Sequence, residues 1–213
     1  GGNTFKGELT KGKHIQLSQE TDYPWDGNIK IKIDKVSSKK EFAIRVRIPG
    51  WANNALVKVN GEIVEEKPGS GTYLSMNRKW KEGDVIELLL PMEARLMVAH
   101  PKAEQLKNQV AIMQGPLLYC IESKDLPADK NINNIRIPSD LTLQEAKSDF
   151  PFGIKTLVGN AFYYDEKPWE GALYRPLETA MHMTNFPISM IPYFAWNNRG
   201  PAAMSVWLPL NVE

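Results

Sequence analysis

A two-residue alternation of apolar and charged side chains constrains the fold of this chain more than any other feature. The segment NIKIKID at residues 28–34 places isoleucines on one face and lysines on the other. The segment EFAIRVRIP at residues 41–49 repeats the pattern, with arginines on the outer face. Because successive side chains of a strand point to opposite sides, this period predicts half-buried β-strands at both segments.

Turn-forming residues indicate where these strands end and where further strands begin. Pro49 lacks the amide hydrogen that a sheet ladder needs, and Gly50 permits backbone angles closed to other residues, so the second strand should end there. Asn60-Gly61 is a dipeptide that readily adopts the left-handed angles of a tight hairpin, which predicts two short strands around it. Residues 71–92 predict two more strands, joined by a loop near Gly83.

The periodicity changes after about residue 100. Residues 108–123 predict two strands joined at Gly115-Pro116, and residues 186–210 predict two strands around an Asn-Asn-Arg-Gly-Pro loop. Residues 124–185 have weak periodicity and many turn formers. Because one sheet rarely holds so many short strands, we predict an all-β chain of two β-sandwich domains, with antiparallel strands and little helix. The predicted domains are residues 1–100 and residues 101–213.

Charge and hydrophobicity argue against two classes of partner. The formal net charge of the 213-residue chain is +1, from 26 basic and 25 acidic residues that are scattered along it. Nucleic acids and anionic membranes are bound by clustered basic charge, so we expect no nucleic-acid and no membrane partner. No apolar run reaches the length that a transmembrane helix requires.

Cys120 is the one candidate nucleophile among the cysteines, because the chain contains no other. It lies in the predicted strand PLLYCIE, where apolar residues occupy both faces and Glu122 is expected to reach solvent at the strand end. A buried thiol has a raised pKa, and the negative charge of Glu122 would raise it further. We therefore interpret Cys120 as a structural residue and predict no catalytic residue in the chain.

The remaining titratable residues do not form a metal or acid/base pattern. The three histidines, His14, His100 and His182, lie far apart and none has a partner at ligand spacing. The adjacent carboxylates Glu65-Glu66 and Asp165-Glu166 lie in turn-like segments, where neighbouring side chains point apart. We predict no metal site and interpret these carboxylates as solvated loop charges.

Aromatic side chains beside polar ones are the main candidates for contact with a ligand or partner. Sugar C–H faces stack on aromatic rings while Asp, Asn and Arg bond the hydroxyls, so such clusters are typical of sugar-binding surfaces. The alternative is that these rings close the ends of the sandwiches or bury an interdomain contact. The candidate residues are Tyr23, Trp25, Asp26, Trp51, Trp169, Trp196, Asn198 and Arg199.

Five segments, in order, resemble one protein family. They are ETDYPWDGNIKIKI, FAIRVRIPGWANNALVKVNGE, GTYLSMNRKWKEGDVIELLLPMEARLMVAHP, VAIMQGPLLYCIES and IPYFAWNNRGPAAMSVWLP. Together they resemble the C-terminal portion of glycoside hydrolase family 127 (DUF1680), which includes β-L-arabinofuranosidases. The resemblance covers nearly the whole chain and is weakest across residues 124–185.

The resemblance implies an activity for a longer parent protein. Members of the family have an N-terminal (α/α)6 barrel that supplies a cysteine nucleophile, a glutamate acid/base and a zinc ion, followed by β-sandwich domains. No catalytic or metal residue of that barrel can be transferred to a position of this sequence. The resemblance therefore implies that this region is inactive, binds no cofactor of its own and packs against its parent's barrel, leaving exposed apolar area expected around Trp25, Trp51 and Trp196.

Two other functions are consistent with the same residues. One is a carbohydrate-binding module that recognises arabinose-containing plant polysaccharides, and the other is a hydrolase that works through Cys120. A parent that degrades polysaccharides would be expected in the periplasm or outside the cell, but no residue of this sequence specifies the compartment.

Overall fold

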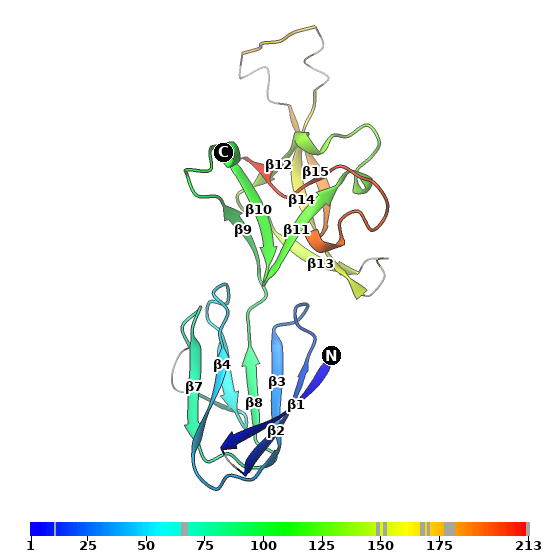
Figure 1. Ribbon diagram of the computed structural model, residues 1–213. Helices are drawn as coiled ribbons and strands as arrows, with labels where there is room; N and C mark the ends of the chain where they lie inside the picture. The colour runs from blue at the N-terminus through cyan, green and yellow to red at the C-terminus, as the bar shows by residue number, and fades with distance from the viewer. Residues whose placement is uncertain are drawn as a thin grey trace. The chain divides into compact units, whose positions relative to one another are not determined.

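The computed structural model describes residues 1–10, 12–64, 68–147, 150, 153–166, 169, 171–176 and 182–211. They belong to two compact units, Gly1–Glu93 and Ala94–Glu213 (Figure 1). The sequence placed the domain boundary after His100, whereas the structural division precedes β9 (Ala94–Val98). The reason is that β9 pairs along its whole length with β10 (Gln109–Gln114) of the second unit.

The first unit contains two sheets. A six-stranded sheet has the order β1-β2-β3-β8-β5-β6, and β4 pairs with β7 in a two-stranded sheet (Figure 1). All of these neighbours are antiparallel. The strands are β1 (Gly2–Thr10), β2 (Lys13–Thr21), β3 (Asn28–Val36), β4 (Phe42–Arg47), β5 (Leu56–Val59), β6 (Glu62–Ile63), β7 (Tyr73–Arg78) and β8 (Val85–Leu89).

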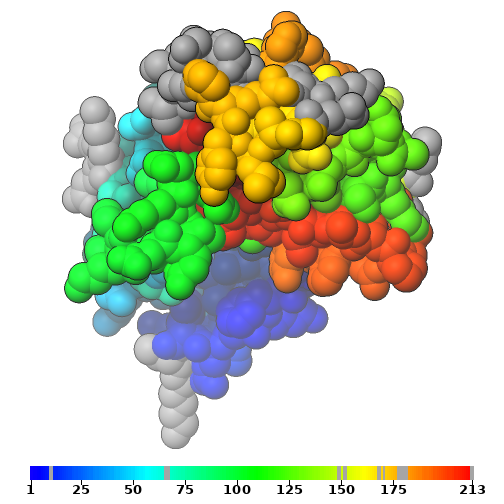
Figure 2. Space-filling view, turned by 90° about the horizontal axis from the view of Figure 1, so that it is seen from above, coloured from blue at the N-terminus to red at the C-terminus, as the bar shows by residue number. Residues whose placement is uncertain are grey.

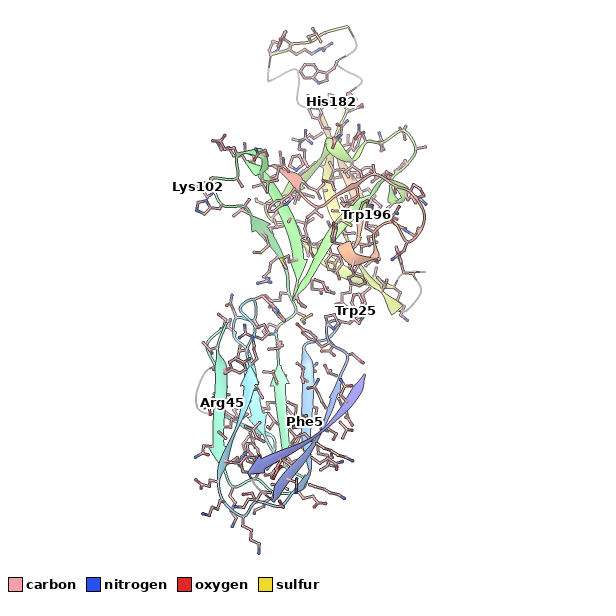
Figure 3. All side chains as sticks on the ribbon, in the orientation of Figure 1. Phe5, Trp25, Arg45, Lys102, His182 and Trp196 are labelled. Atoms are coloured by element: carbon pink, nitrogen blue, oxygen red, sulfur yellow. The ribbon has the colours of Figure 1, made fainter. Side chains whose placement is uncertain are left out.

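The core of the first unit is built from both sheets. Ile33 and Ile86 of the larger sheet are fully buried, and they share one apolar cluster with Val46 and Leu74 of the smaller sheet. The alternation predicted from the sequence is confirmed, because the arginines of β4 are exposed while Val46 is buried between them. Figure 3 labels Arg45 on this strand.

The predicted turns of the first unit are also present. Asn60 and Gly61 have φ angles of 54° and 83°, the left-handed values of a tight hairpin, and they join β5 to β6. The strand β4 ends before Pro49, as expected. Gly50, however, does not use a left-handed φ at this turn. The left-handed residue is Gly71 on the facing segment, with a φ of 77°, and its amide donates to the Ile48 carbonyl at 3.1 Å.

In the second unit the main sheet closes on itself. The pairs β10–β11, β11–β15, β15–β14, β14–β12, β12–β17 and β17–β10 form a barrel-like ring, in which only β12–β17 is parallel. Strands β9, β13 and β16 extend this ring at β10, β14 and β11. The further strands are β11 (Leu117–Glu122), β12 (Ile135–Pro138), β13 (Leu143–Lys147), β14 (Lys155–Tyr164), β15 (Met183–Pro192), β16 (Met204–Ser205) and β17 (Leu208–Asn211).

Helix is limited to short 3-10 turns among the described residues. They are η1 (Glu104–Leu106), η2 (Ser123–Asp125), η3 (Ile132–Asn134) and η6 (Tyr193–Ala195). The predicted fold class, an all-β chain with antiparallel strands and little helix, is confirmed; the closed ring and its parallel β12–β17 pair are additional findings. Within the described part of the chain, no helix has the length and hydrophobicity needed to cross a membrane.

Candidate functional site

The predicted contact residues fall in different units of the structure. The first unit holds Tyr23, Trp25, Asp26 and Trp51, and the second holds Trp169, Trp196, Asn198 and Arg199. Figure 3 labels Trp25 from the first set and Trp196 from the second.

The first set stabilises the turn that precedes β3. Partial burial raises the pKa of Tyr23, while a hydrogen bond from the Trp51 indole acts in the opposite direction. Trp51 packs against the sandwich core, and Trp25 is half-buried. Asp26 Oδ1 accepts hydrogen bonds from the Asn28 backbone amide at 2.9 Å and from its side-chain amide at 2.6 Å. These contacts favour the packing interpretation for this set.

A groove of about 510 Å³ lies on the polar face of the six-stranded sheet. The register of the strands aligns Glu20, Lys30, Glu87 and Lys58 across it. Opposite charges in neighbouring cross-strand positions attract each other and stabilise the sheet. These four cross-strand charges therefore neutralise one another, while Asp22 and Asp26, which also line the groove, add negative charge to it.

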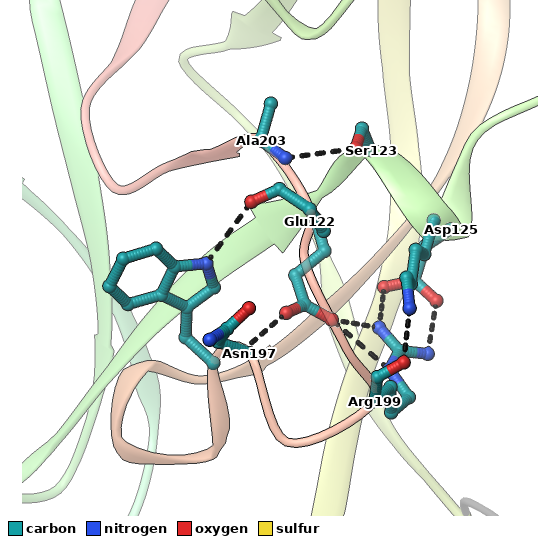
Figure 4. Close-up of polar contacts among 9 residues, drawn as sticks. Glu122, Ser123, Asp125, Asn197, Arg199 and Ala203 are labelled. Carbon is teal, nitrogen blue, oxygen red and sulfur yellow. Dashed lines mark hydrogen bonds and ion pairs between the residues drawn. The ribbon is translucent and has the colours of Figure 1, made fainter.

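In the second unit, four residues form a polar cluster that we call the Glu122–Arg199 cluster: Glu122, Asp125, Asn197 and Arg199 (Figure 4). Arg199 Nε lies 3.1 Å from Glu122 Oε2, and its Nη2 also donates to that oxygen. Arg199 Nη1 and Nη2 donate to the two oxygens of Asp125 at 2.7 and 2.6 Å. The Asn197 backbone amide donates to Glu122 Oε1 at 2.9 Å. Hydrogen bonding to Asp125 raises the pKa of Arg199 above its usual range.

The expectation that Glu122 reaches solvent is wrong. Its side chain has no exposed surface, because the loop that follows β15 folds back over the end of β11 and covers the carboxylate. Lys124 Nζ donates to the Arg199 carbonyl of the same loop. In Figure 2 this loop, in orange-red, lies at the surface beside the light green segment that follows β11. Arg199 is thus used to hold the loop, and its guanidinium also lies 4.6 Å from the centre of the Phe150 ring.

Two rings lie next to each other on this loop, and only Trp196 was predicted as a contact residue from the sequence. Tyr193 and Trp196 stack with their centroids 6.3 Å apart and their planes 16° apart, and we call them the ring pair. Their exposed fractions are 44% and 40%. The signal that could have found Tyr193 is its spacing from Trp196, because residues three apart lie on one side of a 3-10 turn. Asn198, which follows Trp196 closely in the chain, is exposed.

Trp169 has a packing partner in its own unit. Its indole Nε1 donates to the Tyr164 hydroxyl at 2.7 Å, and the residue is half-buried. Nearby, Glu166 Oε1 accepts a hydrogen bond from the Asn134 side chain at 2.8 Å, so this loop carboxylate is not simply solvated. The predicted loop charges Glu65 and Glu66 lie outside the described residues.

Cys120 is fully buried in β11. Desolvation, with a smaller effect of the Glu122 charge, raises the pKa of the Cys120 thiol to about 12. A thiol in this state is protonated at neutral pH, whereas a nucleophilic cysteine acts as a thiolate. Among the residues that the structure describes, no three His, Cys, Asp or Glu side chains gather in a group able to hold a metal ion.

Two family models match the chain in succession. Residues 4–92 match the middle domain of the family described as beta-L-arabinofuranosidase, GH127, and residues 94–209 match the glycoside hydrolase family 127 C-terminal domain. The chain belongs to glycoside hydrolase family 127. The two matched GH127 domains meet at the same place as the two compact units of the structure.

Relatives of this GH127 chain are much longer than it is. A non-reducing end beta-L-arabinofuranosidase of Bifidobacterium longum subsp. longum is 27% identical over 91% of the chain, which covers 30% of that protein. A solved glycoside hydrolase is 40% identical with a TM-score of 0.90, and the chain covers 35% of it. A GH127 beta-L-arabinofuranosidase from Geobacillus stearothermophilus T6 is 35% identical with a TM-score of 0.89, and the chain covers 32% of it. The chain therefore spans about a third of the length of these relatives.

Proposed function

We propose that this chain is the non-catalytic C-terminal region of a GH127 enzyme of the β-L-arabinofuranosidase type. Its role is structural: the two units pack against the catalytic (α/α)6 barrel of the parent enzyme and border its substrate cleft. The observation that carries this proposal is that the chain matches the middle and C-terminal domains end to end while spanning about a third of its relatives.

The chemistry of the described residues supports the same role. The one cysteine is buried with a raised pKa, and the neighbouring Glu122 is committed to an ion pair with Arg199. A glycoside hydrolase requires two groups facing each other across the scissile bond, each in the protonation state its step needs. Neither Cys120 nor Glu122 is placed to meet that requirement.

Activity measurements on two proteins test the proposal. The 213-residue chain and the natural full-length protein are each assayed for release of 4-nitrophenol from 4-nitrophenyl β-L-arabinofuranoside. We expect turnover by the full-length protein and none by the chain alone. Turnover by the chain that disappears in a Cys120→Ser variant would instead make this region a hydrolase.

The packing role has its own measurement. Trp25 and Trp51 are half-buried and Trp196 is exposed, so these residues have surface left for a contact with the barrel. We expect slower hydrogen exchange around at least one of them in the full-length protein than in the 213-residue chain. Equal exchange at all three in both proteins would contradict a packing surface at these residues.

A second candidate function is recognition of arabinose-containing saccharides. The observation that favours it is the ring pair, because two exposed, nearly parallel aromatic rings on the same loop as the exposed Asn198 combine stacking and hydrogen-bonding groups. Calorimetry of the chain with arabinan fragments tests this candidate, and the absence of heat at millimolar sugar would refute it.

A further inference from the structure

The second unit carries an exposed aromatic surface on a well-anchored turn. The 3-10 turn η6 (Tyr193–Ala195) follows directly from the buried end of β15, and Ala195 within it has no exposed surface. The Trp196 amide donates to the Tyr193 carbonyl at 3.1 Å, which closes the turn below the two rings. Because η6 follows the buried end of β15 and contains the buried Ala195, this turn anchors the ring pair to the closed sheet of the second unit.

The Glu122–Arg199 cluster fixes the other end of the same loop. Glu122 accepts from the Asn197 amide, one residue beyond Trp196, and from the Arg199 side chain. Further along, the Ser123 amide donates to the Ala203 carbonyl at 2.8 Å, and the Ala203 amide donates to the Ser123 hydroxyl at 3.1 Å. A loop tied at both ends loses little conformational entropy when a ligand binds, so rings on it are preorganised for contact.

The charge around the ring pair limits which ligands fit it. The positive charge of Arg199 faces two carboxylates, those of Glu122 and Asp125, and is neutralised by them. An anionic ligand would therefore find no unpaired cation in this cluster, and the ammonium of the adjacent Lys124 is directed to the Arg199 carbonyl. The exposed side-chain amides of Asn197 and Asn198 offer uncharged donors and acceptors instead, and neither makes a hydrogen bond with the residues that the structure describes.

Exposed aromatic faces on the same loop as uncharged amides match one class of small ligand. A saccharide presents an apolar C–H face, which stacks on a ring, and hydroxyls at its rim, which bond to amides. We propose that the ring pair, with Asn197 and Asn198, is a binding site for a neutral saccharide of the arabinose-containing class. The Glu122–Arg199 cluster positions this site but does not contact the sugar. The inference rests on the second candidate function, and in the full-length protein it leaves Trp25 and Trp51, rather than Trp196, to contact the barrel.

Binding measurements on ring variants test the site. The 213-residue chain is titrated with arabino-oligosaccharides released from plant arabinan, by calorimetry and by tryptophan fluorescence. We expect Tyr193→Ala and Trp196→Ala each to weaken binding at least tenfold. The conservative variants Tyr193→Phe and Trp196→Phe should retain binding within about threefold, because they keep an aromatic face. The matched control is Tyr73→Ala, which removes a 60% exposed tyrosine of the first unit and should leave binding unchanged.

The possible results separate the site from the function. Binding by the chain that persists in both alanine variants would overturn this site and leave saccharide recognition standing elsewhere on the chain. No binding by the unsubstituted chain at millimolar sugar would overturn both the site and the saccharide-binding function, while the activity assays on the full-length protein would still decide the structural role. Unchanged melting temperatures of the alanine variants exclude unfolding as the cause of any loss.

Discussion

The two units place aromatic residues of their loops in opposite environments. In the first unit, Trp51 packs on the sandwich core and bonds to Tyr23, so its ring closes one end of an apolar interior. In the second unit, Trp196 and Tyr193 remain exposed, and charged residues rather than apolar ones hold their loop. A loop can thus be stabilised either by burying its ring or by burying a carboxylate under it.

The difference has a physical basis in what each loop covers. The first unit is a sandwich with an apolar interior between two sheets, and a ring inserted at its end gains hydrophobic free energy. The second unit closes its sheet into a ring, so the loop after β15 crosses the end of β11 and meets Glu122 instead. A carboxylate in that position needs a cation and amide donors, which Arg199 and Asn197 supply.

The largest loss of stability is expected from substitution of Trp80, a large buried ring of the first unit. Trp80 is 2% exposed, and its indole donates to the Phe42 carbonyl at 3.0 Å. We expect Trp80→Ala to lower the free energy of unfolding by about 3–5 kcal/mol, because it leaves a large cavity. Urea unfolding followed by circular dichroism measures the change. Phe5→Ala, at a 60% exposed position of the same unit, is the control and should change it by less than about 0.5 kcal/mol.

A smaller effect is expected from breaking the Glu122–Arg199 cluster. Arg199→Ala leaves the Glu122 carboxylate buried without its cation, and such losses cost about 3–5 kcal/mol for fully buried pairs. Because the Arg199 side chain is 32% exposed, we expect about 2–3 kcal/mol in urea unfolding. The exposed Arg175→Ala is the matched control.

A double variant tests whether the buried Glu122 charge is the source of this loss of stability. Glu122→Gln combined with Arg199→Met removes both charges, so it should recover part of the stability that Arg199→Ala loses. If the double variant were less stable than Arg199→Ala, the buried charge would not be the source of the loss. The loop of the second unit would then be held by packing, as Trp51 is in the first.

The fold was predictable where the determinants are local. The alternation in β3 and β4 and the Asn60-Gly61 hairpin depend on neighbouring residues, and the structure has them as predicted. The long strand β14 was missed because Gly159 and Asn160 interrupt its apolar pattern. A close approach of a distant chain segment requires glycine at position 159, because a Cβ on Gly159 would lie 2.7 Å from the Thr142 carbonyl oxygen. Periodicity cannot reveal such an approach.

The candidate site was predictable only in part, for the same reason. Trp196, Asn198 and Arg199 drew attention through their composition, and Tyr193 could have been added from its spacing to Trp196. The partner of Arg199 could not, because Glu122 lies 77 residues earlier in the chain. At the end of a strand, an isolated glutamate is ordinarily solvated, and only the closed sheet of the second unit brings a loop over it.

The smallest loss of stability is expected from substitution of Asp84, a partly exposed residue that makes polar contacts in the first unit. Asp84 Oδ1 accepts from the Asn60 side chain at 2.9 Å, and its Oδ2 accepts from the Lys81 amide at 2.8 Å. Partial burial would raise the pKa of Asp84, but these hydrogen bonds and the charges of Arg78 and Lys81 outweigh it and lower the pKa below its ordinary value of 3.8. The contact ties the hairpin turn of β5 and β6 to the loop before β8.

A carboxylate whose pKa is lowered by folding adds stability above its unfolded pKa and loses it as the pH falls through the folded pKa. We therefore expect Asp84→Asn to cost about 1 kcal/mol at pH 7, and this difference should shrink steadily below about pH 4. Unfolding in urea at pH values from 7 down to 3 measures it, with Glu82→Gln in the same loop as the control. A difference that stayed constant across this range would show that Asp84 acts through the shape of the turn and not through its charge.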